Sequence, residues 1–240
     1  MRPLPAPTVP TPVMCHAWRW TSFLHWRYPA QEVQSLLPAG LDVETFDGSA
    51  WVGLVPFLMD DVRPPVLPAL PWLSRFPETN VRTYVRGPDG GSAIWFFSLD
   101  AARLPAVLAG RAGYGLRYFW SDMSFRREGS RLSYRCRRRW PAPIGARADI
   151  DLDIGAPIQD AELDPLTLFL TARHRLYAVI LGRLAGANAE HPPWPLHEAS
   201  LVRRDETLIR SAGLSSPPGE PLVHVSPGVT VRIGMWKWIQ

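Results

Sequence analysis

The 240-residue chain is 46% hydrophobic and 20% charged, which is ordinary for a soluble globular protein with a sizeable core. Its 26 prolines cannot donate to a sheet ladder or sit inside a helix, so they predict many short elements joined by proline-rich loops. Two cysteines without a CxxC spacing exclude a disulfide framework and a zinc-thiolate site, and we expect two buried free thiols.

The first 14 residues alternate proline with small side chains, which predicts a flexible tail ahead of a single domain over residues 15–240. This segment lacks the apolar core of a signal peptide, and no run of about 18 apolar residues occurs anywhere in the chain. We therefore expect a soluble, cytoplasmic protein.

The first elements after the tail are a strand and a short helix. Residues 17–28 are rich in tryptophan and include His25, a composition typical of a buried strand or strand pair. Residues 29–38 begin and end with proline and predict a short helix. Asp47 and Gly48 then predict a two-residue hairpin turn.

Residues 60–77 contain five prolines mixed with large apolar side chains. A polar linker would not carry so many apolar groups, so we interpret this segment as a loop that folds over an opening.

The stretch from Phe76 to Val85 follows this loop and has the composition of a strand. Alternate residues of a strand share a face, so one face would carry Glu78, Asn80, Arg82 and Tyr84. A carboxylate, an amide, a guanidinium and a phenol in one row are costly to bury unless each group finds a partner or a ligand. The row therefore faces either solvent or a polar cavity.

Residues 92–100 are expected to return as the partner strand, residues 103–113 to form a short helix, and the next strand to carry Tyr118. Residues 131–140 are rich in arginine, and residues 148–154 are rich in aspartate.

These two segments predict a hairpin centred on Ile144. That register would set Arg135 opposite Asp153 and Arg139 opposite Asp149, and it would neutralise the basic cluster. The net charge of +4 is therefore not a sign of nucleic-acid binding.

One long helix is predicted from the cap at Asp164 to Gly186, because apolar residues recur at three and four positions. Arg173 lies beside its apolar stripe. The chain then closes with two strands around Pro227 and Gly228. Hairpins with two or three helices indicate one strongly curved antiparallel sheet, mainly β with a few α-helices.

Six stretches carry a family resemblance, in family order: FLHW at 23–26, LLPAGLDVETFDGSAWVGLVPF at 36–57, FPETNVRTYV at 76–85, FFSLDA at 96–101, FLTARHRLY at 169–177 and HPPWPL at 191–196. Together they resemble the DUF2071 (YqjF-like) family of uncharacterised bacterial proteins. The family looks like a distant branch of the acetoacetate decarboxylase fold, a cone-shaped β-barrel with a central cavity. The resemblance implies such a barrel here, with the polar row inside it.

The chain differs from the DUF2071 family and from acetoacetate decarboxylase at residues that matter for chemistry. Most family members carry a Glu and a Tyr where this chain has Ala172 and His174. Acetoacetate decarboxylase forms a Schiff base through a lysine with a lowered pKa, but the single lysine here is Lys237, close to the end of the sequence. We therefore expect the fold without the imine chemistry, and no cofactor.

Arg82 is the best candidate ligand contact, because a guanidinium in a cavity wall holds a carboxylate by two parallel hydrogen bonds. A buried ion pair between Arg82 and Glu78 is the alternative. The remaining candidate ligand-binding residues are Asn80, His25, Tyr84 and Arg173.

Glu78 and Tyr118 are the candidate catalytic residues, as groups that donate or accept a proton. His191 and His197 match no familiar metal-ligand spacing, and we expect no metal site.

Two functions stay open: a cofactor-free enzyme acting on a small carboxylate or keto acid, and a non-catalytic binding or sensing protein built on the same cavity. The expected partner is a small molecule, with neither nucleic acid nor a membrane, and a homo-oligomer is left open.

Overall fold

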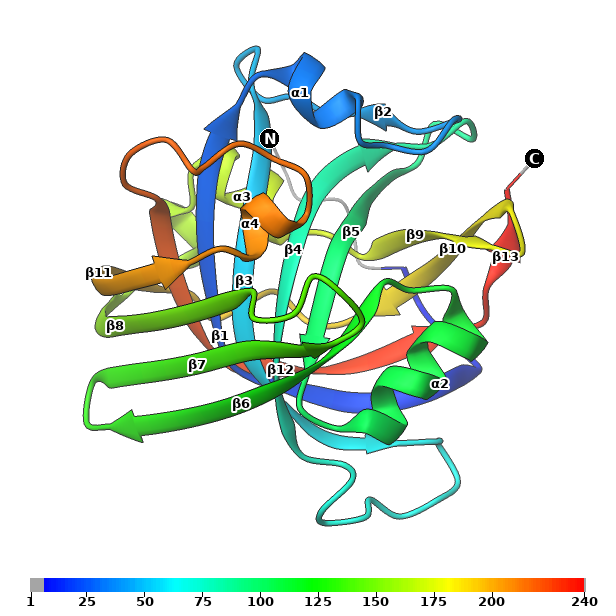
Figure 1. Cartoon of the computed structure of the whole chain (residues 1–240), viewed down its shortest axis with the longest axis horizontal. Helices are drawn as coiled ribbons and strands as arrows, with labels where there is room; N and C mark the ends of the chain where they lie inside the picture. The colour runs from blue at the N-terminus through cyan, green and yellow to red at the C-terminus, as the bar shows by residue number, and fades with distance from the viewer. Residues whose placement is uncertain (1–6, 240) are drawn as a thin grey trace.

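The computed structural model describes residues 7–239. Its strands all belong to one sheet, accompanied by short helices (Figure 1). The strands are β1 (Pro12–Tyr28), β2 (Asp42–Val43), β3 (Ala50–Arg63), β4 (Phe76–Arg86), β5 (Ser92–Ala101), β6 (Tyr118–Glu128), β7 (Arg131–Trp140), β8 (Arg147–Pro157), β9 (Arg175–Ile180), β10 (Arg183–Glu190), β11 (His197–Glu206), β12 (Leu222–Gly234) and β13 (Lys237–Trp238). The helices are α1 (Ala30–Gln34), α2 (Leu104–Tyr114), α3 (Pro165–Thr171), α4 (Leu208–Ser211) and the 3-10 turn η1 (Asp160–Glu162).

The sheet closes into a ring. β1 pairs with both β3 and β12, and β4 pairs with both β3 and β5. The pairings of β5 with β9, β9 with β10 and β10 with β12 then complete a closed circuit of seven strands. The mainly β fold with a curved, ring-like sheet is therefore confirmed. Two pairings, β5 with β6 and β5 with β9, are parallel, whereas an antiparallel sheet was predicted.

Two neighbouring ring strands, β3 and β4, are buried on both faces. All ten residues from Ala50 to Met59 of β3 are buried, as are nine of the eleven residues of β4. A strand whose side chains alternate in direction is buried along its whole length only when both of its faces are covered. One face of each strand packs in the hydrophobic core, which leaves the other face for the interior of the ring.

The predicted tail is partly ordered in the fold. β1 begins at Pro12, and Val9 is buried and donates its backbone N–H to Glu190 at 2.6 Å. Residues 1–6, the rest of the predicted tail, lie outside the described residues. Cys136 is buried as expected, but Cys15 is half-buried. None of the described helices is long and apolar enough to cross a membrane.

The long helix predicted from Asp164 to Gly186 is wrong. The side chain of Asp164 does cap a helix, accepting from the Thr167 backbone N–H at 2.7 Å, but α3 ends at Thr171. The segment that follows is β9, which turns at Leu181 and Gly182 into β10. Leu176 and Ile180 are four positions apart, a spacing that a helix face and a strand face share, so the periodicity alone does not separate the two structures.

The hairpin of β7 and β8 forms, but four positions away from the predicted register. Arg131 lies opposite Asp153 and Arg135 opposite Asp149. The backbone hydrogen bonds end at Arg138, whose N–H donates to the Ala146 carbonyl at 2.8 Å and whose carbonyl accepts from the Gly145 N–H at 2.9 Å. The loop begins early because Pro141 and Pro143 have no N–H to donate.

An even shift keeps the same side chains on the same face of the hairpin. The basic cluster is still paired with carboxylates, by Arg131 with Asp153 at 2.6 Å and by Arg135 with Asp151 at 2.8 Å.

The last two predicted strands are one strand. β12 runs through Pro227 and Gly228 without a break and pairs with β1 on both sides of them. Gly228 has a φ of 129°, and a Cβ there would lie 2.0 Å from the Trp18 carbonyl oxygen. The glycine thus allows the two strands to approach closely where a turn was expected.

Candidate functional site

A cavity of about 350 Å³ lies inside the ring. Each of the seven ring strands contributes at least one lining residue: Met14 of β1, Val55 of β3, Glu78 of β4, Phe96 of β5, Leu176 of β9, Ala189 of β10 and Ile233 of β12. The size is at the lower end of the range of about 300–1,000 Å³ that is typical of small-molecule pockets.

The polar row of β4 faces this cavity. Glu78, Asn80 and Arg82 all line it and are all buried, since alternate residues of the strand point to the same side. Of the two interpretations of the row, solvent or cavity, the structure shows the cavity.

Glu78 is held by a residue from another strand. Tyr118, the first residue of β6, lines the same cavity and donates its hydroxyl proton to Glu78 Oε2 at 3.2 Å. Burial raises the pKa of Glu78 to about 8, and the charge of Asp100 adds to this effect, while the hydrogen bond from Tyr118 opposes it. At neutral pH the carboxyl group is therefore mostly protonated. Burial also raises the pKa of Tyr118 well above its ordinary value.

Arg82 has no counter-ion among the described residues. Its Nη2 donates to the Leu170 carbonyl at 3.2 Å and to the Tyr84 hydroxyl at 3.4 Å, and its buried Nε has no hydrogen-bond partner. The alternative ion pair with Glu78 does not form within the described chain. The buried Asn80 Oδ1 also has no partner. Buried donors and acceptors are rarely left unpaired, which marks both atoms as places for a ligand or water.

Tyr84 and His25 lie behind Arg82 and are not among the residues that line the cavity. The Tyr84 hydroxyl donates its single proton to the Leu170 carbonyl at 2.7 Å, so His25 Nε2, at 2.7 Å from the same oxygen, must be the donor to it. Burial, with the nearby charge of Arg82, holds the pKa of His25 well below its ordinary value, so the ring is neutral. A Cβ at Gly53 would lie 2.9 Å from this imidazole, which explains the glycine on β3.

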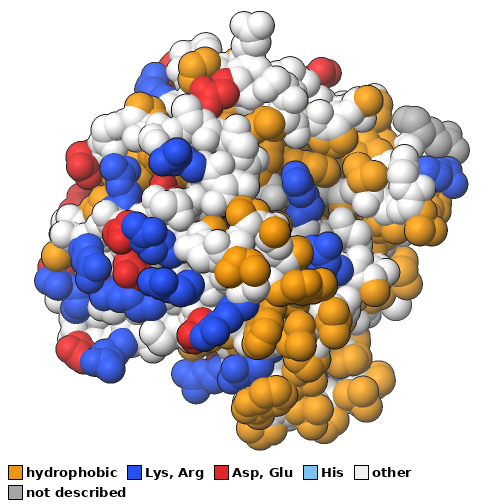
Figure 2. Space-filling model, in the orientation of Figure 1, with side chains coloured by type: hydrophobic (Ala, Val, Ile, Leu, Met, Phe, Trp, Pro, Cys, Tyr) orange, Lys and Arg blue, Asp and Glu red, His pale blue; other side chains and the backbone are white. Residues whose placement is uncertain are grey.

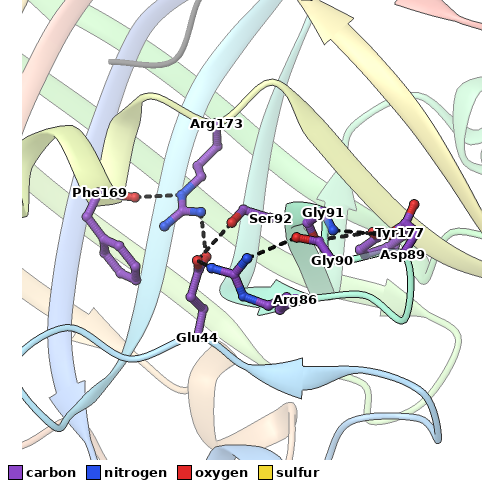
Figure 3. Close-up of polar contacts among 9 residues, drawn as sticks. All are labelled: Glu44, Arg86, Asp89, Gly90, Gly91, Ser92, Phe169, Arg173 and Tyr177. Carbon is purple, nitrogen blue, oxygen red and sulfur yellow. Dashed lines mark hydrogen bonds and ion pairs between the residues drawn. The ribbon is translucent and has the colours of Figure 1, made fainter. Parts of the chain in front are cut away.

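Arg173 lines the cavity just after α3 and is neutralised by Glu44. Figure 3 shows its guanidinium between the Phe169 carbonyl and the Glu44 carboxylate, both at 2.6 Å. Arg86 and Ser92 donate to the other oxygen of the same carboxylate at 2.6 and 2.8 Å. Burial lowers the pKa of Arg173, and Glu44 counteracts this. Arg173 and Arg82 both lie over the Tyr84 ring, at 5.0 and 5.8 Å from its centroid.

A second buried ion pair lies near Glu78. Arg138 donates to both oxygens of Asp100, at 2.8 and 2.6 Å, and Ser121 donates to the same carboxylate at 2.8 Å. Both charged side chains are almost completely buried, at 1% and 0% exposure. Because Asp100 has its charge balanced by Arg138, it is a structural anchor next to the cavity.

The proline-rich loop and α2 frame one end of the cavity. Pro64 and Leu73 of the loop and Pro105 and Ala106 of α2 line it. The predicted covering loop thus does reach the cavity, although much of its apolar surface is exposed. Lys237 is exposed on β13 and is not among the lining residues.

Sequence reasoning brought together Glu78, Asn80, Arg82 and Tyr118 and placed Arg173 nearby. It missed Glu44 and the Asp100–Arg138 pair. Glu44 and Arg173 are 129 positions apart, and no local pattern links them. Asp100 and Arg138 are 38 positions apart, and Arg138 is one of five arginines on β7, so no local pattern singles it out as the partner of Asp100.

The ring and its cavity place the chain in the acetoacetate decarboxylase-like fold. An acetoacetate decarboxylase from Legionella pneumophila superposes with a TM-score of 0.69 over 99% of this chain and 92% of that chain, at 13% sequence identity. The enduracididine biosynthesis enzyme MppR, in complex with pyruvate, superposes with a TM-score of 0.67 over 96% of this chain and 91% of that chain, at 12% identity. At these identities the likeness concerns the fold alone.

Sequence similarity defines the family. The model of DUF2071, described as an uncharacterised conserved protein, matches residues 16–230. The uncharacterised protein YqjF of Bacillus subtilis is 34% identical over 212 residues, which cover 88% of this chain and 86% of that protein. The chain belongs to the DUF2071 family, as its sequence stretches indicated.

Proposed function

We propose that the chain binds a small carboxylate or keto acid in its cavity, with Arg82 as the anchor. The observation that carries this proposal is a buried guanidinium that lines the cavity without a carboxylate partner in the described chain. Burying a charge is costly unless it is paired. An anionic ligand would supply the missing counter-ion, and a guanidinium binds a carboxylate in the plane of its own donors.

The neighbours of Arg82 suit an anion. The charge of Arg173 is balanced by Glu44, so this pair does not compete for Arg82, and Glu78 adds little negative charge at neutral pH because its pKa is about 8. A protonated Glu78 donates a hydrogen bond, for example to a carbonyl oxygen, and Asn80 Oδ1 accepts one from a hydroxyl group. This combination of donors and acceptors matches a keto or hydroxy acid.

A structural neighbour supports the ligand class. MppR, which shares the fold, was solved with bound pyruvate, a keto acid. Imine formation is not part of the proposal, because the single lysine of the chain is exposed on β13. We also place the protein in the cytoplasm, since free cysteines suit a reducing compartment. Neither nucleic acid nor a membrane is part of the proposal.

The test is calorimetric titration of the protein with a panel of keto and hydroxy acids. Arg82→Ala should weaken binding at least tenfold, Arg82→Lys should weaken it less because the charge remains, and Arg126→Ala should leave it unchanged. Arg126 is an exposed arginine on β6 and serves as the matched control. Equal affinity of Arg82→Ala and the wild type would refute the anchor.

A second function, proton transfer, is favoured by the hydrogen bond between Tyr118 and Glu78. A carboxyl group with a pKa of about 8 is poised to gain or lose a proton near neutral pH. In such an enzyme the Glu78 carboxylate takes a proton from the carbon next to the carbonyl of a keto acid and returns it later. Exchange of that hydrogen for deuterium, followed by NMR, would then occur in the wild type and stop in Glu78→Gln. Binding without exchange would leave the binding protein as the function.

A further inference from the structure

The cavity is polar at one end and apolar at the other. β4 enters the ring at Phe76, directly after the proline-rich loop, and its lining residues then become polar at Glu78, Asn80 and Arg82. At about 3.3 Å per residue, Arg82 lies roughly 20 Å along the strand from Phe76. Arg173 lies near Arg82, since both guanidiniums are over the Tyr84 ring, whereas Pro64 and Leu73, which also line the cavity, belong to the loop that precedes Phe76. Arg63, which directly precedes the loop and also lines the cavity, is paired with Asp61 at 3.1 Å, whereas Arg82 has no counter-ion among the described residues. The unbalanced charge of the cavity therefore lies away from the loop.

The apolar end continues onto the surface. In the loop between β3 and β4, the side chains of Val66, Leu67, Leu70 and Trp72 are 90, 55, 57 and 66% exposed. Leu104 and Leu108 of α2 are exposed as well. Figure 2 shows hydrophobic side chains gathered in one area of the surface over the position of the loop and α2.

The loop and α2 are held side by side at this end. Arg103, just before α2, donates its Nε to the Trp72 carbonyl at 2.9 Å, and its guanidinium lies 4.8 Å from the centroid of the Trp72 ring. Both segments also contribute apolar residues to the cavity wall, Leu73 from the loop and Ala106 from α2. The exposed apolar surface of the loop and α2 therefore adjoins the apolar part of the cavity wall.

We propose that the natural ligand is an amphiphilic carboxylate, whose carboxylate binds at Arg82 and whose apolar chain extends between the loop and α2. This inference rests on the proposed function and specifies its ligand. A three-carbon acid such as pyruvate would contact the polar row and leave the apolar end of the cavity unfilled. An unbranched acyl chain would replace water there and gain the hydrophobic contribution of each buried methylene group.

The experiment measures the affinity of unbranched carboxylates of increasing length, from acetate through butyrate and hexanoate to decanoate, by calorimetry at pH 7. Each added methylene is expected to tighten binding by about fourfold until the cavity is filled. The alcohol of the same length should bind at least tenfold more weakly than the acid, because it lacks the charge that pairs with Arg82.

Two variants on one helix test the position of the chain. Ala106 lines the cavity, whereas Ala112 is exposed on α2 and is not a lining residue. Ala106→Phe should remove the gain from the longer chains while leaving acetate and butyrate binding unchanged, and Ala112→Phe should change neither.

The outcomes separate this inference from the proposed function. Arg82-dependent binding that does not vary with chain length would refute the amphiphilic ligand and leave the small carboxylate standing. A gain with length that survives Ala106→Phe would refute the placement of the chain at α2. Equal binding of acids and alcohols would refute the carboxylate anchor and with it both proposals. No binding of any unbranched acid would refute the amphiphilic ligand, and the proposed function would then be decided by the keto and hydroxy acids.

Discussion

Tyr118 donates a hydrogen bond to Glu78 in the wall of a mainly apolar cavity, at 3.2 Å between the two oxygens. The two residues come from β6 and β4, strands that are not neighbours in the sheet. The bond favours the ionised form of Glu78, but burial outweighs it, so the pKa of the carboxyl group rises to about 8. A buried carboxyl group that is protonated at neutral pH has consequences for stability.

The free energy of unfolding of the wild type should fall as pH rises through the window from 4.5 to about 8, whereas that of Glu78→Gln should not show this fall. The pKa of Glu78 rises from 4.5 to about 8 on folding, so between these values the folded state holds a proton that the unfolded state has lost. The contribution of Glu78 is fully present below pH 4.5 and is lost as pH rises to about 8, by at most about 1.4 kcal/mol per pH unit.

The measurement is urea unfolding of both proteins from pH 5 to 9. Other groups, such as His16 with a pKa lowered to about 4 by burial, titrate in both proteins, so the difference between the two curves isolates Glu78. A difference that stays constant over this range would mean that Glu78 is ionised at an ordinary pKa.

Tyr118→Phe should move this window to higher pH. The hydroxyl group of Tyr118 stabilises the Glu78 carboxylate, so its removal raises the pKa of Glu78 further. The loss of the hydrogen bond itself should cost about 1 kcal/mol. Titration of the carboxyl carbon of Glu78 by NMR measures the shift directly. A lower pKa in Tyr118→Phe would show that water replaces the hydroxyl group and solvates the carboxylate better.

Breaking the pair of Asp100 and Arg138 should be strongly destabilising. Both side chains are buried, and Asp100→Asn would leave the Arg138 guanidinium without a counter-ion. Removal of one partner of a buried ion pair typically costs about 3–5 kcal/mol, whereas replacing both by apolar groups costs much less. Asp100→Asn and the double variant Asp100→Leu/Arg138→Met should therefore differ in urea unfolding, with the double variant the more stable. The opposite order would mean that hydrogen bonds other than the ion pair dominate.

The sequence was most informative where a local pattern and burial agree. Alternation along β4 predicted that Glu78, Asn80 and Arg82 share a face, and the family resemblance implied the barrel that encloses them. The same alternation placed Tyr84 with them, but its hydroxyl is taken up by His25 and the Leu170 carbonyl behind Arg82. Periodicity identifies a face, and only tertiary packing decides which members of that face meet the cavity.

Long-range pairing was beyond the reach of local patterns. The residue that neutralises Arg173 is Glu44, which follows β2 outside the ring, so the sequence alone could not show that Arg173 is paired while Arg82 has no carboxylate partner in the described chain. The predicted register of β7 and β8 was wrong for a local reason: Pro141 and Pro143 have no N–H to donate, so the strand pairing stops before them even though a longer hairpin would also match opposite charges.

Lys237→Ala should leave ligand binding and any turnover unchanged. The ammonium group is on the exposed strand β13, outside the cavity wall, so it is not placed to form an imine with a bound keto acid. Incubation with pyruvate and borohydride followed by mass spectrometry checks this directly, with no adduct expected. A trapped adduct at Lys237 would contradict the cavity as the site.

Glu44→Gln should weaken the folded protein and strengthen its binding of a carboxylate. The Glu44 carboxylate neutralises Arg173, and its loss leaves Arg173 and Arg82 as two buried cations over the same Tyr84 ring. Loss of hydrogen bonds to a charged group should cost about 1.5–3 kcal/mol of stability. A bound anion would then supply the counter-charge that Glu44 no longer provides, so we expect affinity to rise several-fold.

Calorimetry of hexanoate with the wild type, Glu44→Gln and Asp153→Asn tests this. Asp153 pairs with Arg131 on the β7–β8 hairpin and is not a lining residue, so its variant controls for the change in net charge. Weaker binding in Glu44→Gln alone would mean that Glu44 serves to position Arg173 for the ligand, since the loss of a competing negative charge can only favour an anion.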